Sequence, residues 1–153
     1  MLHSEFKVET APSGREGLAT IHLLGPFAIV ISDMRMPGLN GAEFLARVRE
    51  LAPQTVRMLL TGYKDLDRAI QAVNEGQIFR YLTKPCGKEE MVSAISLGLI
   101  QYRANVEAAE LLKEAREREM NAAAREREMN VAAEEREMNA EIDFPHELFL
   151  VKE

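Results

Sequence analysis

Residues 27–33, which read FAIVISD, and the following residues 34–38, MRMPG, decide the fold of this chain. Five consecutive apolar residues, three of them β-branched, predict a strand that is buried on both faces, as in a parallel sheet. The strand ends in Asp33, and Pro37-Gly38 then turns the chain into a loop. Ligands of open parallel sheets bind at the carboxyl ends of the strands, so Asp33 lies where an acid can take part in chemistry. For this stretch alone, a solvated aspartate that ends a strand is the alternative.

Helical and extended patterns alternate on both sides of this strand. Alternation of apolar and polar residues, or a short apolar run, predicts further strands at Phe6–Thr10, Thr55–Thr61 and Ile78–Thr83. Apolar residues at helical spacing predict helices at Arg15–Leu24, Gly41–Leu51 and Asp65–Glu75, the last capped by Asp65. Such alternation with short connections predicts right-handed βαβ units. We therefore expect an α/β fold with a parallel sheet wrapped by helices.

Composition excludes several classes of protein. The 153 residues are 46% hydrophobic and 29% charged, as in globular proteins, and the net charge of -6 argues against general nucleic-acid binding. The single cysteine, Cys86, rules out an internal disulfide and fits a reducing compartment. No signal peptide is evident, and the apolar run from Leu23 to Ile31 is too short to span a bilayer. We expect a soluble, cytoplasmic protein without nucleic-acid or membrane partners.

A long helix is predicted after residue 87. Lys88–Ala140 contains no proline and only one glycine, Gly98, and it is rich in strong helix formers. Its later part repeats an REREMN motif and favours a solvated helix with ion pairs such as Glu114 with Arg118. Because glutamates outnumber the arginines, a DNA-reading helix is not expected. The segment Glu147–Val151, which contains the apolar run Leu148–Val151, predicts one more strand.

Several motifs at strand ends resemble the receiver domain of bacterial two-component response regulators. They are Asp33, Met36-Pro37-Gly38, Gly41, Thr61-Gly62, Tyr81 and Lys84-Pro85, within a match that runs from about Phe6 to Ile100. The resemblance implies a flavodoxin-like fold, with a parallel sheet in the order 2-1-3-4-5. It also implies a phosphorelay signalling protein rather than an enzyme.

The resemblance assigns a role to each of these site residues. Asp33 would be the phosphoacceptor, receiving a phosphoryl group from a histidine kinase or a phosphotransfer protein. Lys84 would supply a fixed positive charge, and the Thr61 hydroxyl would bond a phosphoryl oxygen. Tyr81 would be the aromatic switch that turns inward when Thr61 moves. In this family the peptide bond before Pro85 is commonly cis.

The chain departs from this family at its amino terminus. The family's first strand and first helix would precede Phe6, and neither is present there. Their absence would leave a gap on the order of 9–10 Å in the sheet. Residues 148–153, LFLVKE, resemble the missing strand, which usually ends in two acids. We therefore divide the chain into a receiver-like core at 1–100, a helical extension at 101–141 and a C-terminal strand at 142–153.

We expect the C-terminal strand to be supplied by a partner chain, and two alternatives remain open. A partner chain with an antiparallel helix would deliver Glu147–Val151 to the gap and give a reciprocally swapped homodimer. In the second arrangement, the long helix would fold into a hairpin near Asn121 or Asn130 and fill the gap in cis. In the third, the strand is not inserted, and the helix assembles the protein in another way.

The metal site and the function depend on the same segment. Asp33, the carbonyl of Arg35 and Glu153 would hold Mg²⁺, although Lys152 would repel the ion. The first function is therefore a signalling receiver that acts through Tyr81 and the long helix. The alternative is a degenerate, phosphorylation-independent receiver that acts as a dimerisation module. A phosphatase of the haloacid dehalogenase type would need a second aspartate where Arg35 stands.

Overall fold

Three parallel strands form the sheet in the described part of the chain, residues 6–75 and 77–142 of a computed structural model. They are β1 (Ile29–Asp33), β2 (Val56–Thr61) and β3 (Arg80–Thr83), in the order β1-β2-β3. The register sets Asp33 opposite Leu60, and Thr61 opposite Thr83. The carboxyl ends of all three strands therefore meet at one edge of the sheet.

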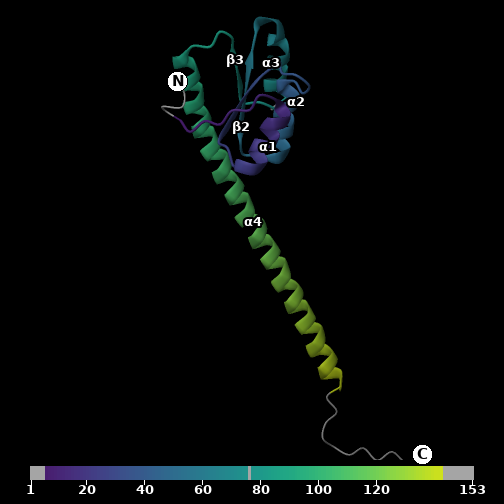
Figure 1. Cartoon of the computed structure of the whole chain (residues 1–153). Coiled ribbons are helices and arrows are strands. Elements are labelled where there is room, and N and C mark those ends of the chain that lie inside the picture. Colours follow the sequence, from purple (N-terminus) through teal and green to yellow (C-terminus); the bar gives the residue numbers. More distant parts are fainter. Residues whose placement is uncertain (1–5, 76, 143–153) are drawn as a thin grey trace, which may run out of the picture. The chain divides into compact units, whose positions relative to one another are not determined.

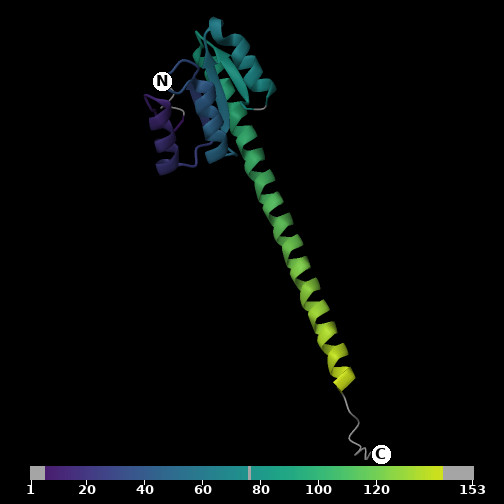
Figure 2. The ribbon, with the colours of Figure 1, turned by 90° about the vertical axis from the view of Figure 1, so that its right-hand side faces the viewer.

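Three helices cover one face of this sheet, and they follow one another across it in Figure 2. They are α1 (Gly14–Leu24), α2 (Gly41–Leu51) and α3 (Leu66–Asn74), and a short 3₁₀ helix, η2 (Tyr63–Asp65), precedes α3. Side chains fix the starts of the first two helices. Ser13 accepts a hydrogen bond from the backbone of Glu16, and Asn40 forms a reciprocal capping box with Glu43.

A hydrophobic core lies on each face of the sheet. On the first face, Leu59 and Tyr81 pack with α1, α2 and α3, in a core that includes Phe44, Leu45 and Val48. On the second face, buried Met58 and Leu82 pack with Ala94 of the last helix. The strands alternate sides with a period of two residues, so each strand contributes to both cores.

The last helix, α4 (Lys88–Ile142), is 55 residues long and uninterrupted, which confirms the predicted long helix. The chain forms two compact units, Met1–Ala109 and Glu110–Glu153, and α4 contributes to both. Within the first unit, α4 lies against the sheet face opposite α1–α3 (Figure 1). Gly98 allows this close packing, because a Cβ there would lie 2.5 Å from Cε of Met58.

In the second unit, the described side chains of α4 are exposed, including several large apolar ones. The latter are Leu111, Leu112, Met120, Met129, Val131 and Met138. The predicted ion pair between Glu114 and Arg118 is present at 3.4 Å. No helix in the described residues is long and apolar enough to cross a membrane.

Two predictions around β1 are wrong. Phe6–Thr10 forms no strand, although Phe6 and Val8 are half-buried and Lys7 and Glu9 exposed, as the alternation predicts. In β1 only Ser32 is buried, and the other four residues are half-buried. Both differences have one cause: β1 is an edge strand among the described residues, so neither segment has the neighbour that would pair with it.

The other strands begin later than predicted, at Val56 and Arg80, whereas helix α2 has the predicted bounds. The predicted strand Glu147–Val151 lies outside the described residues, as do Lys152 and Glu153. The division into segments 1–100, 101–141 and 142–153 stays a prediction.

Candidate functional site

Asp33 ends β1 at the carboxyl edge of the sheet, and its side chain is 38% exposed. The next turn of chain holds this carboxylate, because the backbone N–H of Arg35 donates to Oδ1 at 3.0 Å. The loop then returns so closely that the N–H of Gly41 bonds the carbonyl of Met34. A Cβ on Gly41 would lie 2.1 Å from the carbonyl oxygen of Asp33. Only glycine fits this position behind the acid.

Lys84 forms an ion pair with Asp33, and its Nζ donates to Oδ2. Lys84 follows β3, and its backbone N–H extends the strand ladder by bonding the carbonyl of Thr61 at 2.8 Å. The Lys84–Pro85 peptide bond is cis, as the resemblance implied. The pair thus joins the ends of β1 and β3 across β2.

Competing effects set the pKa of Asp33. Partial burial raises this pKa, but the hydrogen bonds from Lys84 and from the N–H of Arg35, with the charge of Lys84, outweigh burial. The pKa of Asp33 therefore lies below its ordinary value. Asp33 is a carboxylate at neutral pH, the form that acts as a nucleophile.

Thr61 ends β2, between the strands that carry Asp33 and Lys84. Its side chain is fully buried, and its hydroxyl donates to the carbonyl of Gly62 at 3.1 Å. Tyr81 lies opposite Leu59, two residues before the partner of Thr61, so Thr61 and Tyr81 are diagonal neighbours on one face. Tyr81 is half-buried against the core under α1–α3.

Sequence reasoning missed the ion pair between Arg35 and Asp65. The Nε of Arg35 donates to Oδ2 of Asp65 at 2.7 Å, and the Asp65 side chain is only 13% exposed. Asp65 is the N-cap residue of α3, but its side chain makes no capping hydrogen bond, so the predicted role is wrong. This hydrogen bond raises the pKa of Arg35. The signal was available, since both residues follow strands that end at the same edge.

Comparisons with known proteins agree with this geometry. The family model described as "Response regulator receiver domain" matches residues 1–96. The chain belongs to this family. A hydrogenase transcriptional regulatory protein from Cupriavidus necator is 39% identical over 94 residues, which are 61% of this chain and 19% of that protein. The chain therefore spans about a fifth of that relative's length.

Solved structures resemble the receiver domain too. A Clostridium thermocellum response regulator receiver domain protein has 35% identity and a TM-score of 0.60, covering 64% of this chain and 78% of its own. A Rhodopirellula baltica structure titled adenylate cyclase has 45% identity and a TM-score of 0.71, covering 73% of this chain and 83% of its own. The predicted α/β receiver fold and the family resemblance are confirmed.

Receiver domains generally bind Mg²⁺ at the phosphorylation site, and oxygen atoms near Asp33 would have to hold the ion in this one. No group of three or more His, Cys, Asp or Glu residues that could hold a metal occurs in the described residues. Both oxygens of Asp33 accept hydrogen bonds from cationic or backbone donors, and Glu153 lies outside the described residues. Among the described residues, Asp33 and the carbonyl of Arg35 would hold the ion together with water and phosphate oxygens, and the ion would have to displace the hydrogen bond from Lys84.

Proposed function

We propose that this receiver domain accepts a phosphoryl group on Asp33 from a histidine kinase or a phosphotransfer protein. The observation that carries this proposal is the ion pair between Lys84 and Asp33. In this pair the cation of Lys84 lies beside the acid that ends β1. The carboxylate of Asp33 stays partly exposed, so a phosphoryl donor can reach it. Receiver domains of response regulators are phosphorylated by histidine kinases, which agrees with this proposal.

The transfer requires an ionised carboxylate and compensation of charge. An oxygen of Asp33 attacks the phosphorus of a phosphohistidine, an O–P bond forms and the P–N bond breaks. The electron pair of that bond stays on the imidazole, which takes up a proton. Lys84 then moves from the carboxylate to the phosphoryl oxygens, where its charge stabilises the acyl phosphate.

A conformational signal would start at Thr61. In the described structure its hydroxyl bonds the carbonyl of Gly62, and on phosphorylation we expect it to donate to a phosphoryl oxygen instead. Its diagonal neighbour Tyr81 would turn further inward, changing the surface formed by β3 and α3. Only three residues, 85–87, separate Lys84 from the start of α4, so the helix is a direct route for the signal.

Labelling with acetyl phosphate and Mg²⁺, followed by intact-protein mass spectrometry, tests the proposal. We expect one phosphoryl group on the wild-type chain and none on Asp33→Asn. Asp65→Asn is the matched control, because Asp65 lies at the same edge but pairs with Arg35, and it should be labelled like the wild type. A wild-type chain without label, or a fully labelled Asp33→Asn, would contradict the proposal.

The degenerate, phosphorylation-independent assembly module is the second candidate. It is favoured by the ion pair at Asp33, because the charge of Lys84 already compensates that of the carboxylate without phosphate. If the chain is an assembly module, Asp33→Asn would leave its oligomeric mass and its binding to a partner chain unchanged. Both functions suit a cytoplasmic protein with a free cysteine, Cys86.

A further inference from the structure

The outer edge of β1 is open in the described structure. β1 pairs with β2 on one side, and no described strand pairs with it on the other. Natural edge strands usually carry charges, proline or bulges that prevent further pairing. Residues 29–31 of β1 are Ile-Val-Ile, which is the composition of a central strand.

Two cavities flank this open edge, one on each face of the sheet. The first, of about 390 Å³, is lined by Ile29 and Ile31 together with Gly17, Ile21 and Phe44 of α1 and α2. The second, of about 490 Å³, is lined by the same two isoleucines together with Met91, Ile95 and Leu99 of α4. A strand added to β1 would direct alternate side chains into these two cavities.

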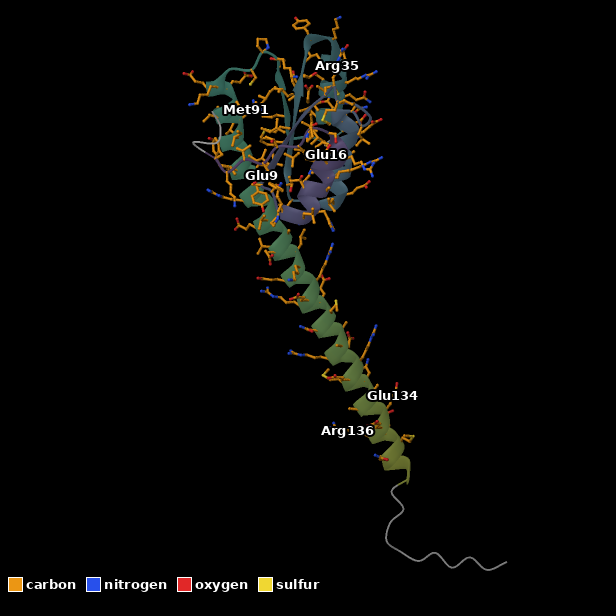
Figure 3. All side chains as sticks on the ribbon, in the orientation of Figure 1. Glu9, Glu16, Arg35, Met91, Glu134 and Arg136 are labelled. Carbon is orange, nitrogen blue, oxygen red and sulfur yellow. The ribbon has the colours of Figure 1, made fainter. Side chains whose placement is uncertain are left out.

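The segment Phe6–Ala11 forms the opposite wall. Residues 9–11 line both cavities, so the open space lies between this segment and β1. In the view of Figure 3, the labelled Glu9 lies below Met91 of α4 and Glu16 of α1. The segment shows the alternating exposure of a strand but has no strand partner among the described residues. One inserted strand would therefore pair with β1 on one side and with Phe6–Thr10 on the other.

We propose that residues 147–151 of a second copy of this chain bind along the open edge of β1. These residues read ELFLV, and Leu148–Val151 form the continuous apolar run that a strand buried on both faces needs. Leu148 and Leu150 would enter one cavity, and Phe149 and Val151 the other. The backbone would add hydrogen bonds to β1, as in recognition by strand addition.

The length of α4 makes a second copy the donor. Within the second unit the helix continues from residue 110 to residue 142 and is about 50 Å long, whereas residues 143–147 span less than about 20 Å when fully extended. Two copies with antiparallel α4 helices would exchange the segment reciprocally, in a closed twofold dimer. The exposed apolar residues Met120 and Met138, which share a face of the helix opposite to Met129, would then face the helix of the partner.

The full chain and its Leu150→Asp variant test this proposal by light scattering and by hydrogen exchange. We expect the wild type to have twice the monomer mass and Leu150→Asp to be a monomer. Amides of residues 27–34 should lose at least tenfold protection in the variant, while those of α2 remain protected. Addition of a synthetic peptide of residues 144–153 should restore protection of 27–34, and the same peptide with the L150D change should not.

A helical control separates this dimer from one held by α4 alone. Met129→Asp changes an exposed apolar residue of α4 and should leave the protection of residues 27–34 in place. A monomeric wild type would overturn the proposal. In a monomer, residues 147–151 bind β1 of their own chain or do not bind β1 at all. A dimer that persists in Leu150→Asp but dissociates in Met129→Asp also overturns it. Labelling of Asp33 is not used, so this result is independent of the proposed phosphotransfer.

Discussion

Lys84 reaches across β2 to donate a hydrogen bond to the carboxylate of Asp33, although 51 residues separate the two in the chain. Parallel strands with short connections bring the residues that follow them to one edge, and this accounts for the contact. The pair neutralises the acid before any phosphate arrives. Replacing Lys84 therefore changes both the stability of the fold and the chemistry of Asp33.

We expect Lys84→Met to raise the pKa of Asp33 and to lower the free energy of unfolding at pH 7. Both side chains are more than a third exposed, so solvent screening limits the loss to at most about 1 kcal/mol. The folded-state pKa of Asp33 is depressed, so the ionised carboxylate stabilises the fold. This stabilisation is present above the unfolded pKa of about 4 and disappears as the pH falls through the folded pKa. Urea unfolding from pH 7 to pH 3 should show that the free energies of unfolding of the wild type and of Lys84→Met converge in acid. The exposed Lys64 provides the control, and Lys64→Met should follow the wild type at every pH.

Thr61→Val should separate phosphorylation from its structural consequence. The change removes a hydroxyl that donates to the carbonyl of Gly62 and keeps the buried shape, which costs about 1 kcal/mol. We expect Asp33 still to be phosphorylated, whereas the ring resonances of Tyr81 no longer shift on phosphorylation. NMR of the aromatic side chains measures this. Thr83→Val, on the exposed partner of Thr61 in β3, should keep the shift. A shift that survives in Thr61→Val would show that Tyr81 responds by another route.

Gly41→Ala should destabilise the fold strongly. The added Cβ would lie 2.1 Å from the carbonyl oxygen of Asp33, and backbone cannot retreat as a flexible side chain can. We expect the free energy of unfolding, measured by chemical denaturation, to fall by about 1–3 kcal/mol or more. Gly87→Ala is the control, because a Cβ there meets nothing within 4 Å. Equal stability of the two variants would mean that the loop behind Asp33 moves easily.

Asn40→Ala should remove the capping box of α2 and cost about 1 kcal/mol. The helix begins at Gly41, beside Asp33, so fraying of its first turn should also speed hydrogen exchange in residues 33–41. Asn40→Ser retains an oxygen that can cap the helix and should restore most of the stability. If the serine variant were as unstable as the alanine variant, the loss would not come from the cap.

Much of the candidate site follows from local sequence patterns. The order of the elements, the bounds of α2 and the continuity of α4 depend on helix formers, caps and turns that lie close together in the chain. The meeting of Asp33, Thr61 and Lys84 also follows, since any parallel sheet places the ends of its strands together. Local chemistry and one topological rule suffice for these features.

Pairing between distant segments is different. Phe6–Thr10 has the alternation of a strand, but a strand exists only beside a partner, and the described residues provide none. Asp65 has the position of a helix cap, yet its carboxylate bonds Arg35 from another loop, because a charged guanidinium is a stronger donor than a backbone N–H. The sequence by itself thus determined the elements and the edge where the site lies. Only the tertiary structure decided which neighbours each element has, because backbone pairing and ion pairs depend on distances that no local pattern encodes.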